Sequence, residues 1–306
     1  MHNSTPAHDV LKETFGYQSF RGTQQAIIER TLAGKHSLVL MPTGGGKSLC
    51  YQVPALVQDG LTVVLSPLIA LMKDQVDAIN ARGIDATFIN SSLTKEARRA
   101  RYRAIENGSY RLLYVTPERF QKSEFRRVLE GRKVPVLAVD EAHCVSQWGH
   151  DFRPEYMRAG EIRQFLGNPT TLALTATATH DVQQDIVHQL GLQENDVQVF
   201  HEGIERPNLA LLVEEVWGED DKLQHLLHIL KKFQAGDGGH IVYFTLIKTL
   251  ERFSRLLEEE GISHGCYHGN LRPVDRKRMQ ERFLSGKEPI VLATNAFGMG
   301  IDKANI

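Results

Sequence analysis

Short apolar runs alternate with helix-like stretches through the first part of the chain. Each run is almost wholly apolar, which is typical of parallel strands that are covered on both faces. The stretches between them, such as Ile69–Ala81 and Lys95–Glu106, carry apolar residues at the spacing of one helix face. We predict buried strands at Ser37–Met41, Thr62–Ser66, Leu112–Val115, Val136–Val139 and Thr171–Leu174. This alternation predicts a doubly wound α/β domain with a parallel sheet and right-handed crossovers.

The rhythm is interrupted by a polar stretch and then resumes. Residues Asn195–Asn208 are predicted to form a linker, because they are polar and include the turn Arg206-Pro207-Asn208. We therefore expect one domain over residues 1–205 and a second over residues 206–306. The second is expected to be incomplete, since Ile306 follows a strand and loop with no helix to cover that strand. Its predicted elements are a helix at Asp221–Lys232, a strand at His240–Phe244, a helix at Thr249–Glu260 and a strand at Ile290–Ala293.

Composition places the chain among ordinary globular proteins. Of its 306 residues, 42% are hydrophobic and 24% are charged, which excludes disordered and collagen-like classes. The three cysteines, Cys50, Cys144 and Cys266, are widely spaced, so neither a disulfide framework nor a zinc site is indicated. No apolar run approaches the roughly 20 residues that span a bilayer, and no signal peptide is visible. We expect a cytoplasmic protein with no membrane partner.

Net charge gives no support for a nucleic-acid partner. Lys and Arg number 36 against 37 Asp and Glu, for a formal net charge of −1. Proteins that bind phosphate backbones usually carry a basic excess. Any surface that binds DNA must therefore be a local concentration of positive charge, balanced by acidic surface elsewhere.

The strongest chemical signal is a glycine-rich segment between a predicted strand and a predicted helix. Its consecutive glycines let backbone N–H groups converge on phosphate oxygens. Lys47 can reach the β and γ phosphates, and Ser48 can ligate Mg²⁺. The general phosphate-loop pattern has a glycine where Met41 stands, and the alternative is a glycine-rich turn with a chance lysine. The residues assigned to this nucleotide site are Met41, Pro42, Thr43, Gly44, Gly45, Gly46, Lys47 and Ser48.

An acidic pair follows the predicted strand Val136–Val139. Asp140 and Glu141 lie at the carboxyl end of that strand, where α/β sheets place their ligands. We expect Asp140 to hold Mg²⁺ and Glu141 to act as the general base on the attacking water, with Lys47 as the third catalytic residue. An isolated acidic pair is most often a solvated turn, but the upstream phosphate loop favours the catalytic interpretation.

Together with Thr175-Ala176-Thr177-Ala178, these segments resemble motifs I, II and III of superfamily 2 helicases. Residues near the N-terminus resemble motif 0 of the RecQ family of ATP-dependent DNA helicases. That resemblance implies that Tyr17 stacks on adenine and that Arg21 and Gln24 belong to the same site. Core packing is the alternative for Tyr17. The resemblance also implies RecA-like lobes, with His143, Thr175 and Thr177 coupling the ATP site to DNA.

The segment from Cys144 to Pro154 resembles the aromatic-rich loop of RecQ helicases. The resemblance implies that Trp148 and Phe152 stack on unpaired bases and that Arg153 contacts phosphate or signals DNA occupancy. Buried core aromatics are the alternative, but Gly149 and the polar neighbours favour a loop.

Weaker segments fit the same resemblance and are ordinary turns or caps when taken alone. They imply DNA contacts at Ser66, Pro67, Asn90, Thr294 and Gly298, and an Asp302 that faces the nucleotide. The arginines Arg98, Arg99, Arg101 and Arg103 scatter around a predicted helix and are interpreted as mostly solvated surface.

The resemblance implies two RecA-like doubly wound parallel-sheet lobes, the second incomplete, in an ATP- and Mg²⁺-dependent 3′ to 5′ DNA helicase. Its expected partner is single-stranded or partial duplex DNA, in recombination and repair. The family's motif VI, which carries an arginine finger, is not found before Ile306. We therefore expect this chain to bind nucleotide and to turn it over poorly. The alternatives are an RNA helicase of the same superfamily and a non-catalytic nucleotide- and DNA-binding fragment.

Overall fold

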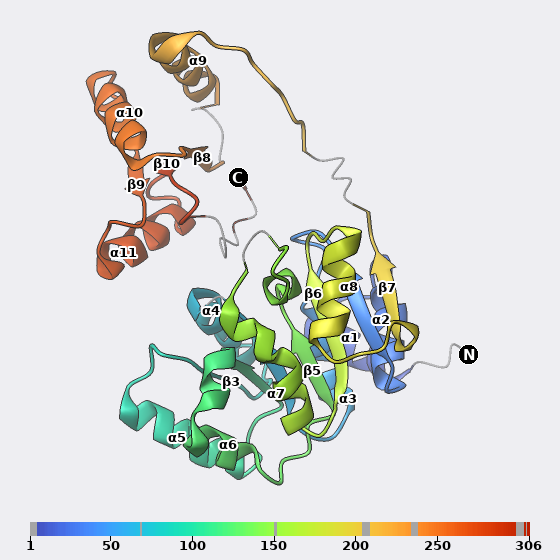
Figure 1. The fold of residues 1–306 in the computed structure, drawn as a ribbon. Helices are drawn as coiled ribbons and strands as arrows, with labels where there is room; N and C mark the ends of the chain where they lie inside the picture. The colour runs from blue at the N-terminus through green and yellow to red at the C-terminus, as the bar shows by residue number, and fades with distance from the viewer. Residues whose placement is uncertain are drawn as a thin grey trace. The chain divides into compact units, whose positions relative to one another are not determined.

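The chain forms two compact units, Met1–Arg206 and Pro207–Ile306 (Figure 1). A computed structural model describes residues 5–67, 69–149, 152–203, 209–233, 238–297, 303, 305 and 306. Within these ranges, no helix combines the length and the apolar character needed to cross a membrane.

Unit 1 is built on a parallel sheet with the strand order β3-β4-β2-β5-β6-β1-β7. The predicted strands are confirmed to within one residue at either end. In chain order the strands are β1 (His36–Leu40), β2 (Thr62–Leu65), β3 (Ala86–Ile89), β4 (Leu112–Val115), β5 (Val136–Val139), β6 (Thr170–Thr175) and β7 (Val197–His201).

The two edge strands, β3 and β7, are absent from the predicted set. The prediction of a linker over Asn195–Asn208 is wrong for Val197–His201, because these residues form β7 and pair in parallel with β1. Four of the five residues of β7 are at least partly exposed, and two of these, Gln198 and His201, are polar, so this edge strand lacks the buried apolar signature of the interior strands.

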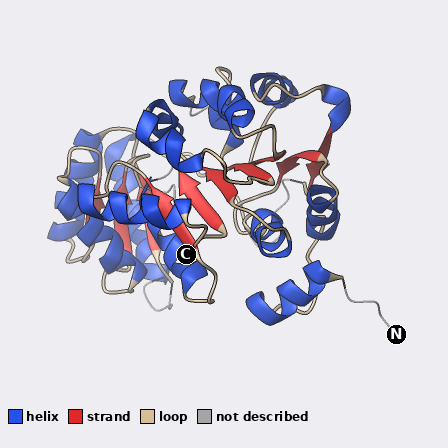
Figure 2. Cartoon of the chain, turned by 90° about the horizontal axis from the view of Figure 1, so that it is seen from below, coloured by secondary structure: helices blue, strands red, loops and turns tan. Residues whose placement is uncertain are grey.

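Two layers of helices enclose the sheet of unit 1 (Figure 2). Side chains of one strand alternate between them: Val64 packs with α1–α4, whereas Val63 and Leu65 pack with α5–α8. The first layer consists of α1 (Pro6–Phe15), α2 (Gln24–Leu32), α3 (Leu49–Val57) and α4 (Ile69–Asn80). The second consists of α5 (Lys95–Glu106), α6 (Ser123–Leu129), α7 (Ala159–Phe165) and α8 (His180–Gln189). Short 3₁₀ turns lie at η1 (Pro117–Gln121), η2 (Ala142–Val145), η3 (Pro154–Arg158) and η4 (Glu194–Asp196).

The outer edge of β3 is covered by side chains. Asn80 Oδ1 accepts a hydrogen bond from the Ala86 N–H at 2.9 Å. Arg101 Nη1 donates to the Phe88 carbonyl at 2.7 Å, and its guanidinium lies 4.0 Å from the centre of the Phe88 ring. The interpretation of Arg101 as solvated surface is therefore wrong, since it satisfies backbone that would otherwise template a further strand.

Unit 2 contains a smaller parallel sheet of order β8-β10-β9. Side chains of α9 and α10 pack on one face of β10, and Phe283 of α11 packs on the other. The helices are α9 (Gly218–Phe233), α10 (Ile247–Glu259) and α11 (Pro273–Leu284), and the strands are β8 (His240–Tyr243), β9 (Gly265–Tyr267) and β10 (Ile290–Ala293). The predicted helices and strands of this region are confirmed, and β9 and α11 are additional.

Replacing Arg101 tests the protection of the β3 edge. We expect Arg101→Ala to lower the free energy of unfolding by about 1–2 kcal/mol, because it removes a charge-assisted hydrogen bond and a cation–π contact. Arg99→Ala, on the exposed side of the same helix, should change it by less than about 0.5 kcal/mol. Urea unfolding followed by circular dichroism measures both. Equal stabilities for the two variants would contradict the assignment.

Candidate nucleotide site and nucleic-acid interface

The predicted site segments of unit 1 lie at one edge of its sheet. All strand pairs of that sheet are parallel, so their carboxyl ends meet at the same edge. The segments that follow are Met41–Ser48 after β1, Ser66-Pro67 after β2, Asn90 after β3 and Asp140-Glu141 after β5, and Thr175 ends β6.

A pocket of about 110 Å³ joins the N-terminal segment to the phosphate loop. It contains three residues predicted to recognise adenine and the three glycines predicted to bind phosphate, although the two groups are separated in sequence. Tyr17 is 43% exposed there, so core packing does not account for it. The lining residues are Tyr17, Ser19, Arg21, Gln24, Gly44, Gly45, Gly46 and Leu49.

Gln24 bridges the two walls of this pocket. Its Oε1 accepts a hydrogen bond from the Arg21 N–H at 2.9 Å, and its Nε2 donates to the Gly45 carbonyl at 3.1 Å. A Cβ at Gly46 would lie 2.3 Å from Gln24 Nε2, so any larger residue at this position would displace the end of the Gln24 side chain. An adenine read by Gln24 would have to exchange at least one of these bonds for its own.

The phosphate loop is held closely against the end of β1. Gly44 and Gly46 both have φ +83, a backbone conformation that favours glycine. A Cβ at Gly45 would lie 2.6 Å from Met41 Cγ, which explains the second glycine. Met41 itself is fully buried and accepts a hydrogen bond from Lys47 Nζ on its carbonyl at 3.2 Å. Met41 therefore contacts the phosphate loop through its carbonyl, and its buried side chain does not line the pocket. Pro42 is partly buried and Thr43 is exposed.

Asp140 is the most perturbed carboxylate near the loop. Desolvation by burial, followed by the charge of Glu141, raises the pKa of Asp140 to about 7, while the Lys47 charge acts in the opposite direction. Its backbone N–H donates to the Leu65 carbonyl at 2.8 Å. A desolvated carboxylate that faces a lysine and a phosphate loop fits a divalent cation, which would supply the missing positive charge. Ser48, the N-cap residue of α3, is the second residue suited to that ion.

Two buried tyrosines near Ser48 and Asp140 were not singled out in the sequence analysis. The hydroxyls of Tyr51 and Tyr114 are 3.3 Å apart, and the Ser48 hydroxyl hydrogen-bonds to Tyr51. Burial raises the pKa of Tyr114 to about 12. The one sequence signal for Tyr51 is its spacing, since a residue three positions after Ser48 shares its helix face.

The acidic segment adopts a special backbone. Glu141 has φ 49 and ψ 49, the left-handed conformation that costs energy for a residue with a Cβ. His143 follows and contacts Thr175 Oγ1 through Nδ1 at 2.9 Å, with Glu141 Oε2 at 3.5 Å from the same nitrogen. Thr175 Oγ1 donates to the Thr177 carbonyl at 3.1 Å. The three residues predicted to couple ATP and DNA therefore form one connected chain of contacts.

The aromatic loop rests directly on this segment. Trp148 is 78% exposed in a turn. A Cβ at the next residue, Gly149, would lie 2.2 Å from the His143 carbonyl oxygen, so the loop touches the backbone of the acidic segment. Arg153 closes the loop: its N–H donates to the Cys144 carbonyl at 3.1 Å and its Nη1 to the Pro67 carbonyl at 3.0 Å. Phe152 is partly buried.

Other predicted DNA contacts differ in accessibility. Ser66, Pro67 and Asn90 are buried, and Asn90 Oδ1 accepts hydrogen bonds from the Ser92 N–H and hydroxyl at 3.0 and 2.7 Å. The Asn90 side chain thus shapes its own turn rather than facing outward. Thr294, after β10, is partly buried. The predictions for Gly298 and Asp302 lie outside the described residues.

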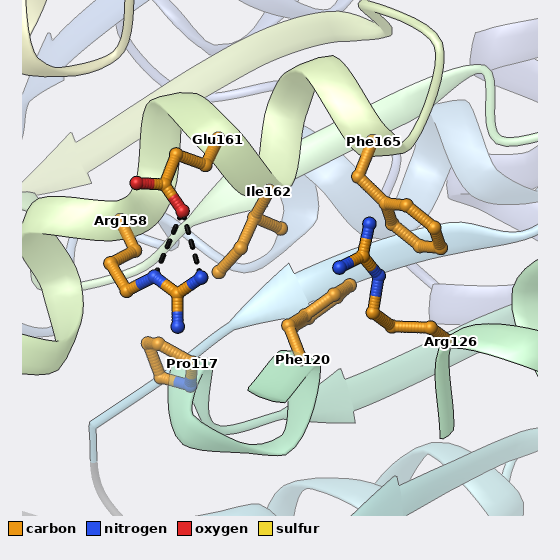
Figure 3. A pocket seen from close by; sticks show the side chains of 7 residues that line it. All are labelled: Pro117, Phe120, Arg126, Arg158, Glu161, Ile162 and Phe165. Atoms are coloured by element: carbon orange, nitrogen blue, oxygen red, sulfur yellow. Dashed lines mark hydrogen bonds and ion pairs between the residues drawn. The ribbon is translucent and has the colours of Figure 1, made fainter. Parts of the chain in front are cut away.

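A second hollow of unit 1 contains none of the assigned site residues (Figure 3). Arg158 is neutralised there by Glu161, with Nε and Nη2 at 2.9 and 2.8 Å from Oε2. The Arg126 guanidinium stacks 4.5 Å from the centre of the Phe165 ring. Both cations already have partners, so this hollow offers no comparable anion site.

Family comparisons cover most of the chain. Residues 21–186 match the DEAD/DEAH box helicase family, and residues 221–306 match the helicase conserved C-terminal domain.

Individual proteins agree with this assignment. The chain is 43% identical to the ATP-dependent DNA helicase RecQ of Haemophilus influenzae over 98% of its own length and 47% of the relative's. It is 45% identical to the protein of the same name from Bacillus subtilis, over 98% of the chain and 50% of the relative. The chain therefore spans about half the length of these relatives. Saccharomyces cerevisiae Dbp5 bound to RNA and ADP BeF3 shares the fold, with a TM-score of 0.74, 17% identity and coverage of 96% of this chain and 75% of that one.

The desolvated Asp140 predicts a pH-dependent stabilisation by Asp140→Asn. Because folding raises the pKa of this acid, the folded chain binds the proton more tightly than the unfolded chain, and stability is lost as pH rises from about 4 to about 7. Asparagine removes that loss. In EDTA, we expect the gain of the variant in unfolding free energy to grow with pH and to reach a few kcal/mol, at about 1.4 kcal/mol per pKa unit, above pH 7.

Urea unfolding at pH 5.5 and pH 8 measures this gain. Asp59→Asn is the control, because the Asp59 side chain is 89% exposed and should give no comparable trend. A gain that does not grow between the two pH values would contradict the desolvation of the Asp140 carboxylate.

Proposed function

This chain belongs to the RecQ family of DEAD/DEAH box helicases, and from that membership we propose that it is the motor core of an ATP-dependent DNA helicase. The observation that carries the proposal is the pocket in which Tyr17, Arg21 and Gln24 meet the glycines of the phosphate loop. A base-recognising wall next to a phosphate-binding wall is what a nucleoside triphosphate requires. The chain spans about half the length of these relatives, and the helicase activity is proposed for the whole protein.

The binding step is derived from the phosphate loop. Its backbone N–H groups and the N-terminus of α3 attract the phosphates, and Lys47 moves from the Met41 carbonyl to the β and γ phosphates. Tyr17 stacks on adenine from the exposed side of the pocket. Ser48 and Asp140 would hold Mg²⁺, which supplies positive charge to the phosphate oxygens when bound.

The chemical step falls to Glu141 in this proposal. Its carboxylate accepts the proton of the attacking water, and one oxygen of that carboxylate, Oε2, lies 3.5 Å from His143 Nδ1. Thr175 pairs with Leu40 at the end of β1, just before the phosphate loop, and His143 Nδ1 lies 2.9 Å from Thr175 Oγ1. In this proposal, a movement of the phosphate loop is transmitted to the acidic segment through the contact between Thr175 and His143.

Nucleic acid is proposed to bind along the same sheet edge. Trp148 offers an exposed aromatic face for an unpaired base, and Arg153 fixes its loop to the segment after β2. We assign DNA rather than RNA because the relatives that are 43% and 45% identical are named DNA helicases, and we carry over 3′ to 5′ translocation from the family. A cytoplasmic site of action accords with this role, and Cys50, Cys144 and Cys266 form no disulfide within the described residues.

Nucleotide binding is tested by Lys47→Ala. We expect the dissociation constant for a fluorescent ATP analogue with Mg²⁺ to rise at least about tenfold, because a charge-assisted contact to phosphate is lost. Lys35→Ala, which removes an exposed lysine just before β1, is the control and should bind as the unmodified chain does. Unchanged binding in the Lys47 variant would refute the site.

DNA binding is tested by Trp148→Ala. Loss of one stacked base should weaken single-stranded DNA binding about tenfold, measured by fluorescence anisotropy, without lowering the melting temperature. Trp217→Ala removes a tryptophan that is 86% exposed in unit 2 and is the matched control. Equal losses in the two variants would show that stacking at Trp148 is not specific.

Two alternatives are decided by turnover in the full-length protein. Stimulation of ATPase activity by RNA as well as by single-stranded DNA of equal length would favour an RNA helicase. Turnover that Glu141→Gln leaves unchanged would favour a binding role alone.

A further inference from the structure

Glu202 contacts the adenine wall of the pocket from behind without lining it. Its Oε1 accepts hydrogen bonds from the Thr23 backbone N–H at 2.6 Å and from the Thr23 hydroxyl at 3.0 Å. Thr23 is the N-cap residue of α2, and in the sequence it lies between two residues of the pocket wall: Gln24 follows it directly and Arg21 precedes it by two positions. The carboxylate therefore holds the turn that presents both predicted adenine contacts.

The backbone of Glu202 is fixed to the other wall. Its N–H donates to the Leu40 carbonyl at 3.1 Å, at the end of β1 and immediately before the phosphate loop. One residue thus ties α2 by its side chain and β1 by its main chain. The distance between the base-binding turn and the phosphate-binding loop depends on both bonds.

The fit around the carboxylate is close. Gly22 has φ +47, and a Cβ there would lie 2.1 Å from Glu202 Oε1. No acidic residue of α2 lies in its own first turn, so Glu202 supplies the negative charge that a helix N-terminus favours. A structural role in extending the pairing of β7 with β1 would not require these side-chain contacts, because that pairing uses backbone bonds alone.

We propose that Glu202 is a positioning residue for nucleotide selectivity: it sets the Arg21–Gln24 turn at the separation from the phosphate loop that adenine requires. This inference rests on the proposed nucleotide site and adds the residue that determines its base preference. Removing the carboxylate frees the turn, so the contacts to the base weaken while those to the phosphates persist.

Fluorescent ATP and GTP analogues, bound to the 306-residue chain with Mg²⁺, separate these effects. We expect Glu202→Ala to raise the dissociation constant for the ATP analogue about five- to tenfold and that for the GTP analogue less than about twofold, since one charge-assisted anchor is lost. Glu202→Gln keeps an acceptor oxygen and should stay within about threefold of the unmodified chain. Gly22→Ala disturbs the same contact from the opposite side and should reproduce the loss of preference.

The control is Glu29→Ala, because Glu29 lies on α2 and accepts a hydrogen bond from Gln25 at an exposed site. An unchanged ATP-to-GTP ratio in Glu202→Ala, or equal weakening of both nucleotides, would overturn the inference, whatever happens to the melting temperature. An unmodified chain that binds neither nucleotide, or both equally, would instead refute the proposed adenine site.

Discussion

Parallel pairing of β1 with β6 on one side and β7 on the other is the constraint on which the site depends. The register aligns Leu40 with Thr175 and with His201, so three chain segments end together at the base of the phosphate loop. β1 leads into the phosphate loop, β6 ends at Thr175, which contacts His143, and β7 leads to Glu202. No local sequence preference could assemble these groups, because only the sheet makes them neighbours.

The rest of unit 1 offsets the energetic cost of two site residues, Asp140 and Glu141. Asp140 is desolvated and Glu141 adopts a left-handed backbone, and both carry an energetic cost in the absence of ligand. The strand that precedes them is fully buried between two helical layers, which holds the segment in place. The apolar interiors of the strands therefore supply stability, and the polar residues at the strand ends carry the proposed chemistry.

Elements with a strong apolar signature could be predicted from the sequence, and those whose role depends on an edge could not. The strands at Leu112–Val115 and Val136–Val139 have interior composition and match their predicted bounds. The edge strand β7 has polar residues facing water and therefore resembled a linker. Arg101 resembled its exposed neighbours, because nothing in a helix sequence indicates which arginine reaches a neighbouring strand's carbonyl.

The same limit applies to the site. The glycine motif and the N-terminal motif singled out Tyr17, Arg21, Gln24 and three glycines, and these residues line one pocket. The solvent exposure of individual residues could not be predicted. Asn90 and Met41 were both assigned to ligand contact, but their side chains are buried. The contacts of Tyr51 with Tyr114 and of Thr23 with Glu202 join segments far apart in the chain, so only the folded sheet reveals them.

The separation of 179 residues between Thr23 and Glu202 has a consequence for biosynthesis. β1 emerges early from the ribosome, yet both of its neighbours in the sheet, β6 and β7, are translated much later. Until then the phosphate loop has neither its flanking strands nor the anchor of its adenine turn, and such late pairing slows folding. The nucleotide pocket is thus among the last parts of unit 1 to be completed, and ATP can first assist folding only after nearly the whole unit has been synthesised.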